Sequence, residues 1–152
     1  MALFGGKPAV KPLRLMALEA DDLPPISALV QDAALRFGDM VYDVEGRHFT
    51  LRMNRFCHEA EAEGGPPLRA PSVLRLSCVT GVKLRGLDAK APQQALSLLD
   101  ISADPLEPPA YGLTLRFAGE GVRDIRIEAE CIDVLLLDLA APRRARLAPN
   151  HA

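Results

Sequence analysis

The sequence contains no tryptophan, and aromatic residues make up only 5% of it. It has three cysteines, Cys57, Cys78 and Cys131, at no regular spacing. An odd and irregular set argues against a disulfide framework and favours a reducing compartment. No window reaches the ~20 apolar residues that cross a membrane, and the N-terminus has glycine and proline where a secretory signal needs an apolar stretch. We therefore expect a cytoplasmic protein without a membrane segment.

An excess of charge of one sign is also lacking. The chain carries 18 basic and 20 acidic residues, which gives a formal net charge of -2. Such a balance produces no overall field that would draw in nucleic acid or an acidic membrane. Arg143, Arg144 and Arg146 do cluster, but a trio near the end of a chain is typical of a solvated tail. The sequence therefore indicates no nucleic-acid partner and no membrane partner.

Motifs that carry chemistry are missing as well. The Gly119–Gly121 segment lacks the Lys-Ser or Lys-Thr and the helix start of a phosphate-binding loop. Zinc needs three or four converging ligands, whereas Cys57 and His58 form a lone adjacent pair. Cys78 and Cys131 fall at positions expected to be buried and unreactive, and only Cys57 has a possible base nearby. We expect no metal and no cofactor, and an enzyme is the less favoured hypothesis.

The chain does contain a clear alternation of apolar and polar residues in its C-terminal third. The alternating apolar residues are Tyr111, Leu113, Leu115 and Phe117, followed by Ile125, Ile127, Ala129 and Cys131. A side-chain period of two predicts a β-hairpin with one face toward an apolar interior.

The charges on this hairpin predict its register. In one register Arg116 faces Asp124, and in the shifted alternative it faces Arg126. Opposite charges facing across strands stabilise the pair and like charges destabilise it, by roughly 0.2–1 kcal/mol. We therefore predict the register in which Leu115 pairs with Ile125.

The rest of the chain predicts one clear helix and several strands. A helix over residues 22–32 would begin after an aspartate and hold Pro24 and Pro25 in its first turn. We expect strands over residues 13–18, 34–43, 47–56 and 95–102, and one long strand bent at Gly81 over 73–79 and 82–87. Residues 57–71, rich in glycine and proline, are expected to form a surface loop. Residues 131–139 show helical spacing, with a strand buried on both faces as the alternative.

These elements predict a single α+β domain over residues 13–139. Its core would be a largely antiparallel, curved sheet or partly closed barrel with one or two covering helices. Residues 1–12 are expected to form a loose lead-in and residues 140–152 a C-terminal tail. A chain of 152 residues is long enough to bury the core of one domain.

The most unusual local feature is the segment Met53–Phe56. Alternation slips here, because Arg55 falls where an inward residue is due, and this favours a bulge or a strand end. A buried arginine must be paired, and the candidate partners are Asp32, Asp39 and Glu59. The simpler alternative is an exposed arginine at a strand end. If this region is a binding site, its predicted residues are Gln31, Asp32, Asn54 and Arg55.

Seven short segments between about Leu13 and Leu139 carry a family resemblance: residues 16–23, 27–28, 31–33, 38–39, 54–56, 117–119 and 130–132. They resemble a bacterial family of about this length that is catalogued only as a domain of unknown function. The resemblance implies no activity, although members are often encoded beside histidinol dehydrogenase. This chain departs from the family pattern at His58, where an aromatic residue is usual, and at 142–146, which replace a tryptophan-bearing tail.

The missing chemistry favours a non-catalytic accessory or protein-binding module in the cytoplasm. Such a module would act by contact with another protein or with a second copy of itself. The alternative is a small-metabolite-binding protein, or an enzyme, with a site around Asn54 and Arg55.

Overall fold

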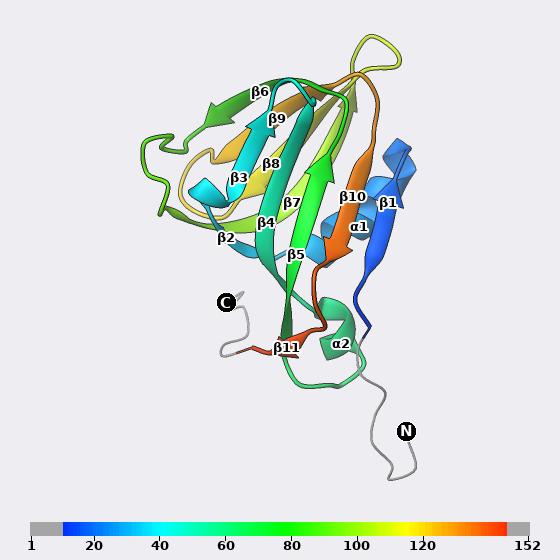
Figure 1. Cartoon of the computed structure of the whole chain (residues 1–152), viewed down its shortest axis with the longest axis vertical. Helices are drawn as coiled ribbons and strands as arrows, with labels where there is room; N and C mark the ends of the chain where they lie inside the picture. Colours follow the sequence, from blue (N-terminus) through cyan, green and yellow to red (C-terminus); the bar gives the residue numbers. More distant parts are fainter. Residues whose placement is uncertain (1–10, 146–152) are drawn as a thin grey trace.

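The computed structural model describes residues 11–145. Its strands are β1 (Arg14–Ala17), β2 (Ala34–Arg36), β3 (Met40–Asp43), β4 (His48–Phe56), β5 (Leu68–Leu76), β6 (Val79–Arg85), β7 (Ala95–Pro105), β8 (Tyr111–Phe117), β9 (Asp124–Ala129), β10 (Val134–Asp138) and β11 (Arg143–Arg144). Its helices are α1 (Leu23–Val30) and α2 (His58–Ala62), with short 3-10 turns η2 (Ala20–Asp22) and η3 (Phe37–Asp39) (Figure 1). Neither α1 nor α2 has the length and apolar character that crossing a bilayer requires.

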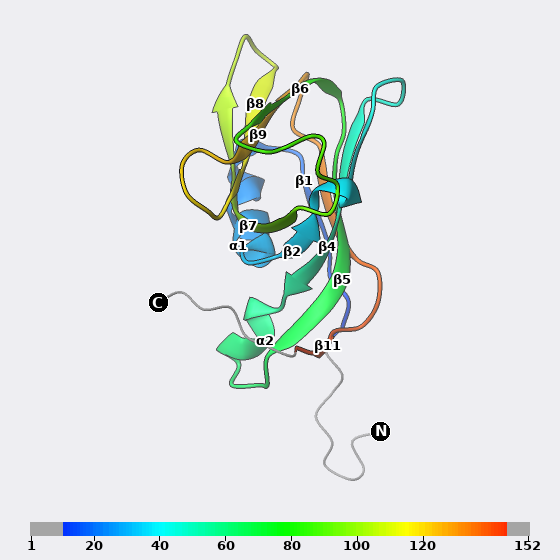
Figure 2. The same ribbon diagram turned by 90° about the vertical axis from the view of Figure 1, so that its left-hand side faces the viewer.

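The strands form one antiparallel sheet in the order β1-β10-β5-β4-β2-β7-β8-β9-β6, with β3 added to β4 and β11 added to β5. Strand β2 joins the two halves, because Ala34 pairs both with Asn54 of β4 and with Ser97 of β7. Figure 2 shows the sheet curving at this point, so that β4 and β5 face β8 and β9. The predicted α+β class with a curved antiparallel sheet is confirmed, and β1 and β6 lie at the two ends of an unclosed sheet.

The apolar core lies between the two halves of the sheet. Leu51 and Leu74 from one half and Leu115 and Ile127 from the other are all fully buried. Aliphatic side chains fill this space, as the scarcity of aromatic residues predicts. Burial of apolar surface at roughly 25 cal/mol per Å² is therefore the main force that holds the two halves together.

Helix α1 covers one end of the core with the buried side chains of Leu23, Ile26 and Val30. The predicted helix is confirmed, with prolines in its first turn as expected. It ends two residues earlier than predicted, because the backbone is extended at Gln31 and left-handed at Asp32, where φ is 67°.

The predicted hairpin and its register are confirmed. Strands β8 and β9 pair with Leu115 opposite Ile125 and Arg116 opposite Asp124. The inward apolar side chains predicted from Leu113 to Ala129 are buried. Here local pattern and tertiary structure agree, because a slip of one residue would turn every apolar side chain toward water.

The helix predicted for residues 131–139 is wrong, and the alternative strand is right. Strand β10 lies between β1 and β5 and pairs with both. Val134 and Leu136 are fully buried, while Leu135 and Leu137 on the other face are half-buried. The helical spacing arose because Ile132, in the turn before the strand, also points into the core.

Three other boundaries differ from the prediction. Residues 57–71 contain α2 and the first part of β5 instead of an uninterrupted loop. The strand predicted at 34–43 is broken by η3 into β2 and β3. The strand predicted at 73–87 is two strands, because β5 pairs with β4 and β10 while β6 pairs with β9, and Gly81 lies at a bulge within β6.

The chain after β10 returns to the sheet within the segment predicted to be a tail. Arg143 and Arg144 form the two-residue strand β11 against Arg69 and Leu68 of β5. Residues 1–10 of the lead-in expected at 1–12, and residues 146–152 of the expected tail, lie outside the described part of the chain. The return of β11 matters because it brings two arginines next to Asn54 and Arg69.

Candidate functional site

Arg55 lies inside the molecule, and its side chain has no exposed surface. Its Nε and Nη2 donate to the Asp138 carboxylate at 3.0 and 2.9 Å. Its Nη1 and Nη2 donate to the Glu59 carboxylate, both at 2.9 Å. Of the three predicted partners, only Glu59 is right, and Asp138 is a partner that the sequence did not suggest.

Asp138 is itself held by further donors. The Ser72 hydroxyl donates to its Oδ1 at 2.6 Å, and the Leu13 backbone N–H donates to its Oδ2 at 2.9 Å. Burial raises the pKa of Asp138, but the hydrogen bonds from Arg55, Ser72 and Leu13 outweigh it and hold that pKa below the usual range. Burial likewise lowers the pKa of Arg55, and its bonds to Glu59 and Asp138 reverse that effect. This satisfied network links β4, β5, β10 and α2, so we assign Arg55 a structural role.

The other three predicted site residues do not gather around Arg55. Gln31 is exposed and lines a groove between α1 and β7. Asp32 is 8% exposed, and its carboxylate lies 3.2 Å from Nε2 of His58. Asn54 is exposed on the face of β4 opposite Arg55, because successive residues of a strand point to opposite sides. The predicted cluster is therefore divided between the interior and two separate surfaces.

Asn54 lines a groove of about 650 Å³ beside β11, at the lower end of the sheet in Figure 1. We call it the arginine groove, and its lining residues are Ala34, Asn54, Arg69, Pro71, Ala140, Arg143, Arg144 and Ala145. Its volume falls within the range of small-molecule sites. Small apolar side chains and guanidinium groups together form its wall, which suits a ligand with an anionic part and a less polar part.

The arginine groove brings like charges together. Pairing of β11 with β5 sets Arg143 directly opposite Arg69, and Arg144 is the next residue. Like charges facing across strands destabilise a sheet by roughly 0.2–1 kcal/mol. Within residues 11–145, no carboxylate forms an ion pair with Arg143 or Arg144, while Asp32 interacts electrostatically with Arg69. The groove therefore concentrates positive charge from three arginines, with Asp32 as the negative charge that acts on Arg69.

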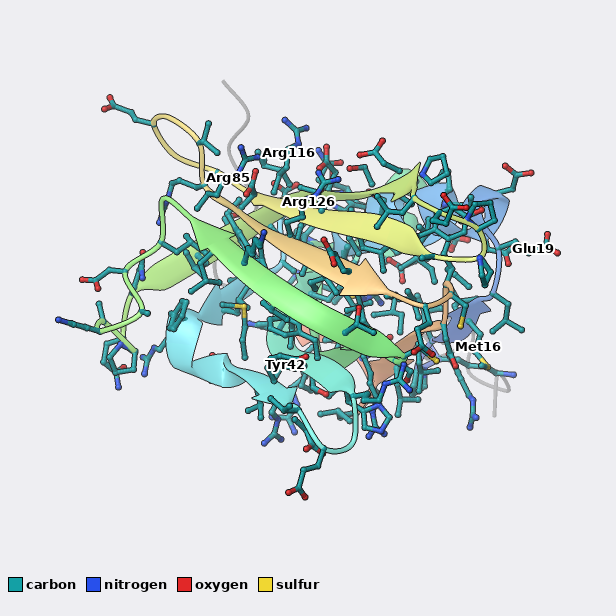
Figure 3. All side chains as sticks on the ribbon, turned by 90° about the horizontal axis from the view of Figure 1, so that it is seen from above. Met16, Glu19, Tyr42, Arg85, Arg116 and Arg126 are labelled. Atoms are coloured by element: carbon teal, nitrogen blue, oxygen red, sulfur yellow. The ribbon has the colours of Figure 1, made fainter. Side chains whose placement is uncertain are left out.

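Three arginines on another part of the sheet each have an acidic partner. Figure 3 shows Arg85, Arg116 and Arg126 near one another on the half of the sheet formed by β8, β9 and β6. Each of them forms an ion pair with an aspartate, the partners being Asp124, Asp100 and Asp104 in that order. Arg52 and Arg75 also form no ion pair within residues 11–145, so what distinguishes the arginine groove is that Arg69 and Arg143 face each other across paired strands.

Arg69 is the most constrained cation of the groove. Its Nη1 donates to the backbone carbonyls of Asn54 at 2.8 Å and Asp32 at 3.2 Å. Its guanidinium lies 5.6 Å from the ring centre of Phe56, within cation–π range. Burial lowers the pKa of Arg69, and the nearby charge of Asp32 offsets this in part. An anion bound in the groove would therefore meet a guanidinium that is already fixed in place.

Comparison with known proteins places this geometry in a family. A family described as "Protein of unknown function (DUF2948)" matches residues 13–151. The chain belongs to this family. No curated protein and no solved structure matches the chain. The resemblance to an uncharacterised domain family is therefore confirmed, and the matched segment of this DUF2948 member includes the whole arginine groove.

The Cys57 and His58 pair of this DUF2948 member is not arranged for nucleophilic catalysis. Burial raises the pKa of the Cys57 thiol to about 11, which disfavours the thiolate. The His58 ring lies beside Gln31, with Nε2 2.8 Å from its carbonyl oxygen. No group of three or more metal-ligating side chains occurs in the part of the chain that the structure describes.

Sequence reasoning identified one residue of the arginine groove, Asn54, and interpreted Arg143 and Arg144 as a tail. The adjacent arginines after Pro142 were the sequence signal for a cationic site. The strand that places them could not be predicted, because two residues are too few to show alternation. Arg69 gave no signal, because it lies in a segment rich in glycine and proline that the sequence assigned to a loop.

Proposed function

We propose that the protein binds a small anionic metabolite in the arginine groove. The observation that carries this proposal is that Arg69 and Arg143 face each other across paired strands, and that Arg143 forms no ion pair with a carboxylate among residues 11–145. Guanidinium groups form paired hydrogen bonds with the oxygens of carboxylates and phosphates. A bound carboxylate or phosphate would relieve the repulsion between the facing guanidinium groups.

The proposed ligand carries its charge at one end. Asn54 and Arg144 flank the facing arginines, so several donors are available to one anionic group. Ala34, Pro71 and Ala140 give the rest of the groove an apolar surface. A carboxylate or phosphate attached to a compact, weakly polar body fits this arrangement better than a free inorganic ion.

A thermal-shift screen tests this proposal. Carboxylates, sugar phosphates and nucleoside phosphates form the panel, with uncharged analogues of each as controls. We expect at least one anion to stabilise the protein by RT ln(1 + [L]/Kd), which is about 2.7 kcal/mol at a hundredfold excess over Kd. Calorimetric titration then gives the Kd, and a rise of Kd with salt is expected because the contact is ionic.

Substitutions locate the site. Arg143→Gln combined with Arg144→Gln should raise the Kd at least tenfold, since hydrogen bonds to charged groups contribute about 1.5–3 kcal/mol. Arg75→Gln is the matched control, because Arg75 is an exposed arginine on β5 that lies outside the groove. It should change the Kd less than about twofold. Absence of saturable binding across the panel, or equal weakening by Arg75→Gln, contradicts the proposal.

A second candidate function is binding of a protein partner, which we propose as a second copy of this chain docking on β1. Strand β1 is the end of the sheet and pairs only with β10 within the described residues. Met16 and Leu18 are 52% and 60% exposed, and Figure 3 shows Met16 at the outside of the molecule. An open strand edge with exposed apolar side chains favours pairing with another strand.

Self-association on β1 predicts that the apparent molecular mass of the protein rises with protein concentration. Light scattering after size exclusion should report a dimer, and Met16→Lys should raise the dimer dissociation constant at least tenfold by placing charge on the edge. Val122→Lys is the control, because Val122 is 58% exposed in the loop between β8 and β9. This substitution should leave the dimer dissociation constant unchanged. A monomer at every protein concentration would exclude self-association on β1.

We also propose a cytoplasmic location and an accessory role without catalysis of its own. Cys57, Cys78 and Cys131 are all free thiols, which suits the reducing compartment expected from the sequence. The accessory role is supported by the arginine groove, whose arrangement is that of a binding site.

A further inference from the structure

Cys78 and Cys131, predicted to be buried and unreactive, instead lie half-exposed beside each other. Cys78 is in the turn between β5 and β6, and Cys131 follows β9. The pairing of Val79 with Ala129 aligns the two segments, and the backbone N–H of Glu130 donates to the Cys78 carbonyl at 2.9 Å. These backbone contacts bring Cys78 and Cys131 to the same end of the β6–β9 pair.

Cys78 also has an unusual backbone conformation. Its φ is 60°, in the left-handed region that residues with a Cβ adopt infrequently. Outliers of this kind concentrate at functional positions, where the surrounding structure holds them in place. Here Cys78 lies in the turn from β5 to β6. The backbone hydrogen bond from Glu130, the residue that follows β9, to the Cys78 carbonyl holds this turn in place.

A cation lies near this pair of cysteines. Both cysteines interact electrostatically with the Arg47 guanidinium, which forms an ion pair with Glu130 at 2.6 Å. A nearby cation stabilises a thiolate, and the thiolate is the nucleophile in sulfur oxidation. The interaction with Cys78 and burial raise the pKa of Cys131, which favours the protonated form of that thiol.

We propose that Cys78 and Cys131 form a redox-active dithiol that closes to an intramolecular disulfide when the protein meets a peroxide. This inference is independent of the arginine groove. Cys78 and Cys131 are half-exposed and are brought together by the β6–β9 pairing, whereas Cys57 is fully buried. A transient disulfide of this kind is compatible with a compartment in which thiols are otherwise kept reduced.

The chemistry proceeds in two displacements. The Cys78 thiolate attacks one oxygen of hydrogen peroxide, the O–O bond breaks, and the departing hydroxide takes a proton to become water. Cys78 is then a sulfenic acid. The Cys131 sulfur attacks the Cys78 sulfur, the S–S bond forms, and the S–O oxygen leaves as a second water with the proton of Cys131. The sum is two thiols and one peroxide giving one disulfide and two waters.

The experiment exposes the reduced, full-length protein to a small molar excess of hydrogen peroxide, removes the peroxide and divides the sample, and only the portion used for peptide mapping has its remaining thiols blocked. Intact mass without reductant should fall by two hydrogen atoms. Thiol titration of the denatured protein should fall from the three free cysteines to one. Peptide mapping should find the Cys78–Cys131 linkage, and dithiothreitol should restore all three thiols.

Variants assign each sulfur its role. Cys57→Ser should still form the disulfide, because that thiol takes no part. Cys131→Ser should stop at a sulfenic acid on Cys78 that a dimedone-type reagent traps, and no intramolecular disulfide should form. Retention of all three thiols in the wild-type protein, addition of oxygen without loss of hydrogen, or a linkage that includes Cys57 would each overturn the proposal.

Discussion

Replacing Arg55 with methionine should lower the free energy of unfolding by about 3–5 kcal/mol. Methionine fills a similar volume but leaves the Asp138 carboxylate buried at 0% side-chain exposure without its cationic partner. An uncompensated buried charge costs far more than the loss of one exposed ion pair, because no water can replace the missing donors. Urea unfolding of both proteins measures the difference, with the m-value checked for constancy.

Arg52→Met provides the matched control on the same strand. Arg52 is exposed, and within the described residues it forms no ion pair. The same chemical change there should alter the free energy of unfolding by no more than about 0.5 kcal/mol. Equal effects at Arg52 and Arg55 would mean that the network around Asp138 does not stabilise the fold. Arg55→Lys should give an intermediate loss, since it keeps the charge and loses the paired hydrogen bonds.

Leu115→Ala should destabilise the protein by about 2–5 kcal/mol. Leu115 is fully buried in the middle of β8, between the two halves of the sheet. Truncation removes apolar atoms from the core and leaves a cavity that the neighbouring strands, fixed by hydrogen bonds on both sides of β8, fill only in part. Thermal or urea unfolding measures the loss.

Leu84→Ala tests whether burial is the cause. Leu84 belongs to the same cross-strand row, because Ile125 pairs with Leu115 on one side and with Leu84 on the other. It lies on the end strand β6 and is 37% exposed. The same truncation should therefore cost no more than about 1 kcal/mol. Comparable losses at the two positions would contradict the assignment of the core to the space between the sheet halves.

The candidate site shows where sequence reasoning reached its limit. Arg55 was correctly singled out as an arginine that must be paired if buried, since alternation alone places it on the inward face. Glu59, four residues away, was within reach of local reasoning. Asp138 was not, because it is 83 residues distant and its strand had been assigned to a helix. The prediction that Arg55 and Asn54 share one site failed because adjacent residues of a strand point to opposite faces.

The arginine groove depends wholly on tertiary structure. Asn54, Arg69 and Arg143 come from three segments, and only the pairing of β11 with β5 and of β5 with β4 brings them together. Each of these residues is an ordinary exposed or half-exposed polar residue when considered alone. Their significance lies in the like charges that face each other, which no local pattern encodes.

The sequence by itself determined the hairpin of β8 and β9, its register, helix α1 and the α+β class, because alternation, cross-strand charge and proline placement act between near neighbours. Tertiary structure alone decided that residues 134–138 form a strand, that Asp138 holds Arg55, and that Cys78 lies beside Cys131. Those outcomes follow from which strands pair, and strand pairing is set by burying the apolar faces of the entire sheet against one another.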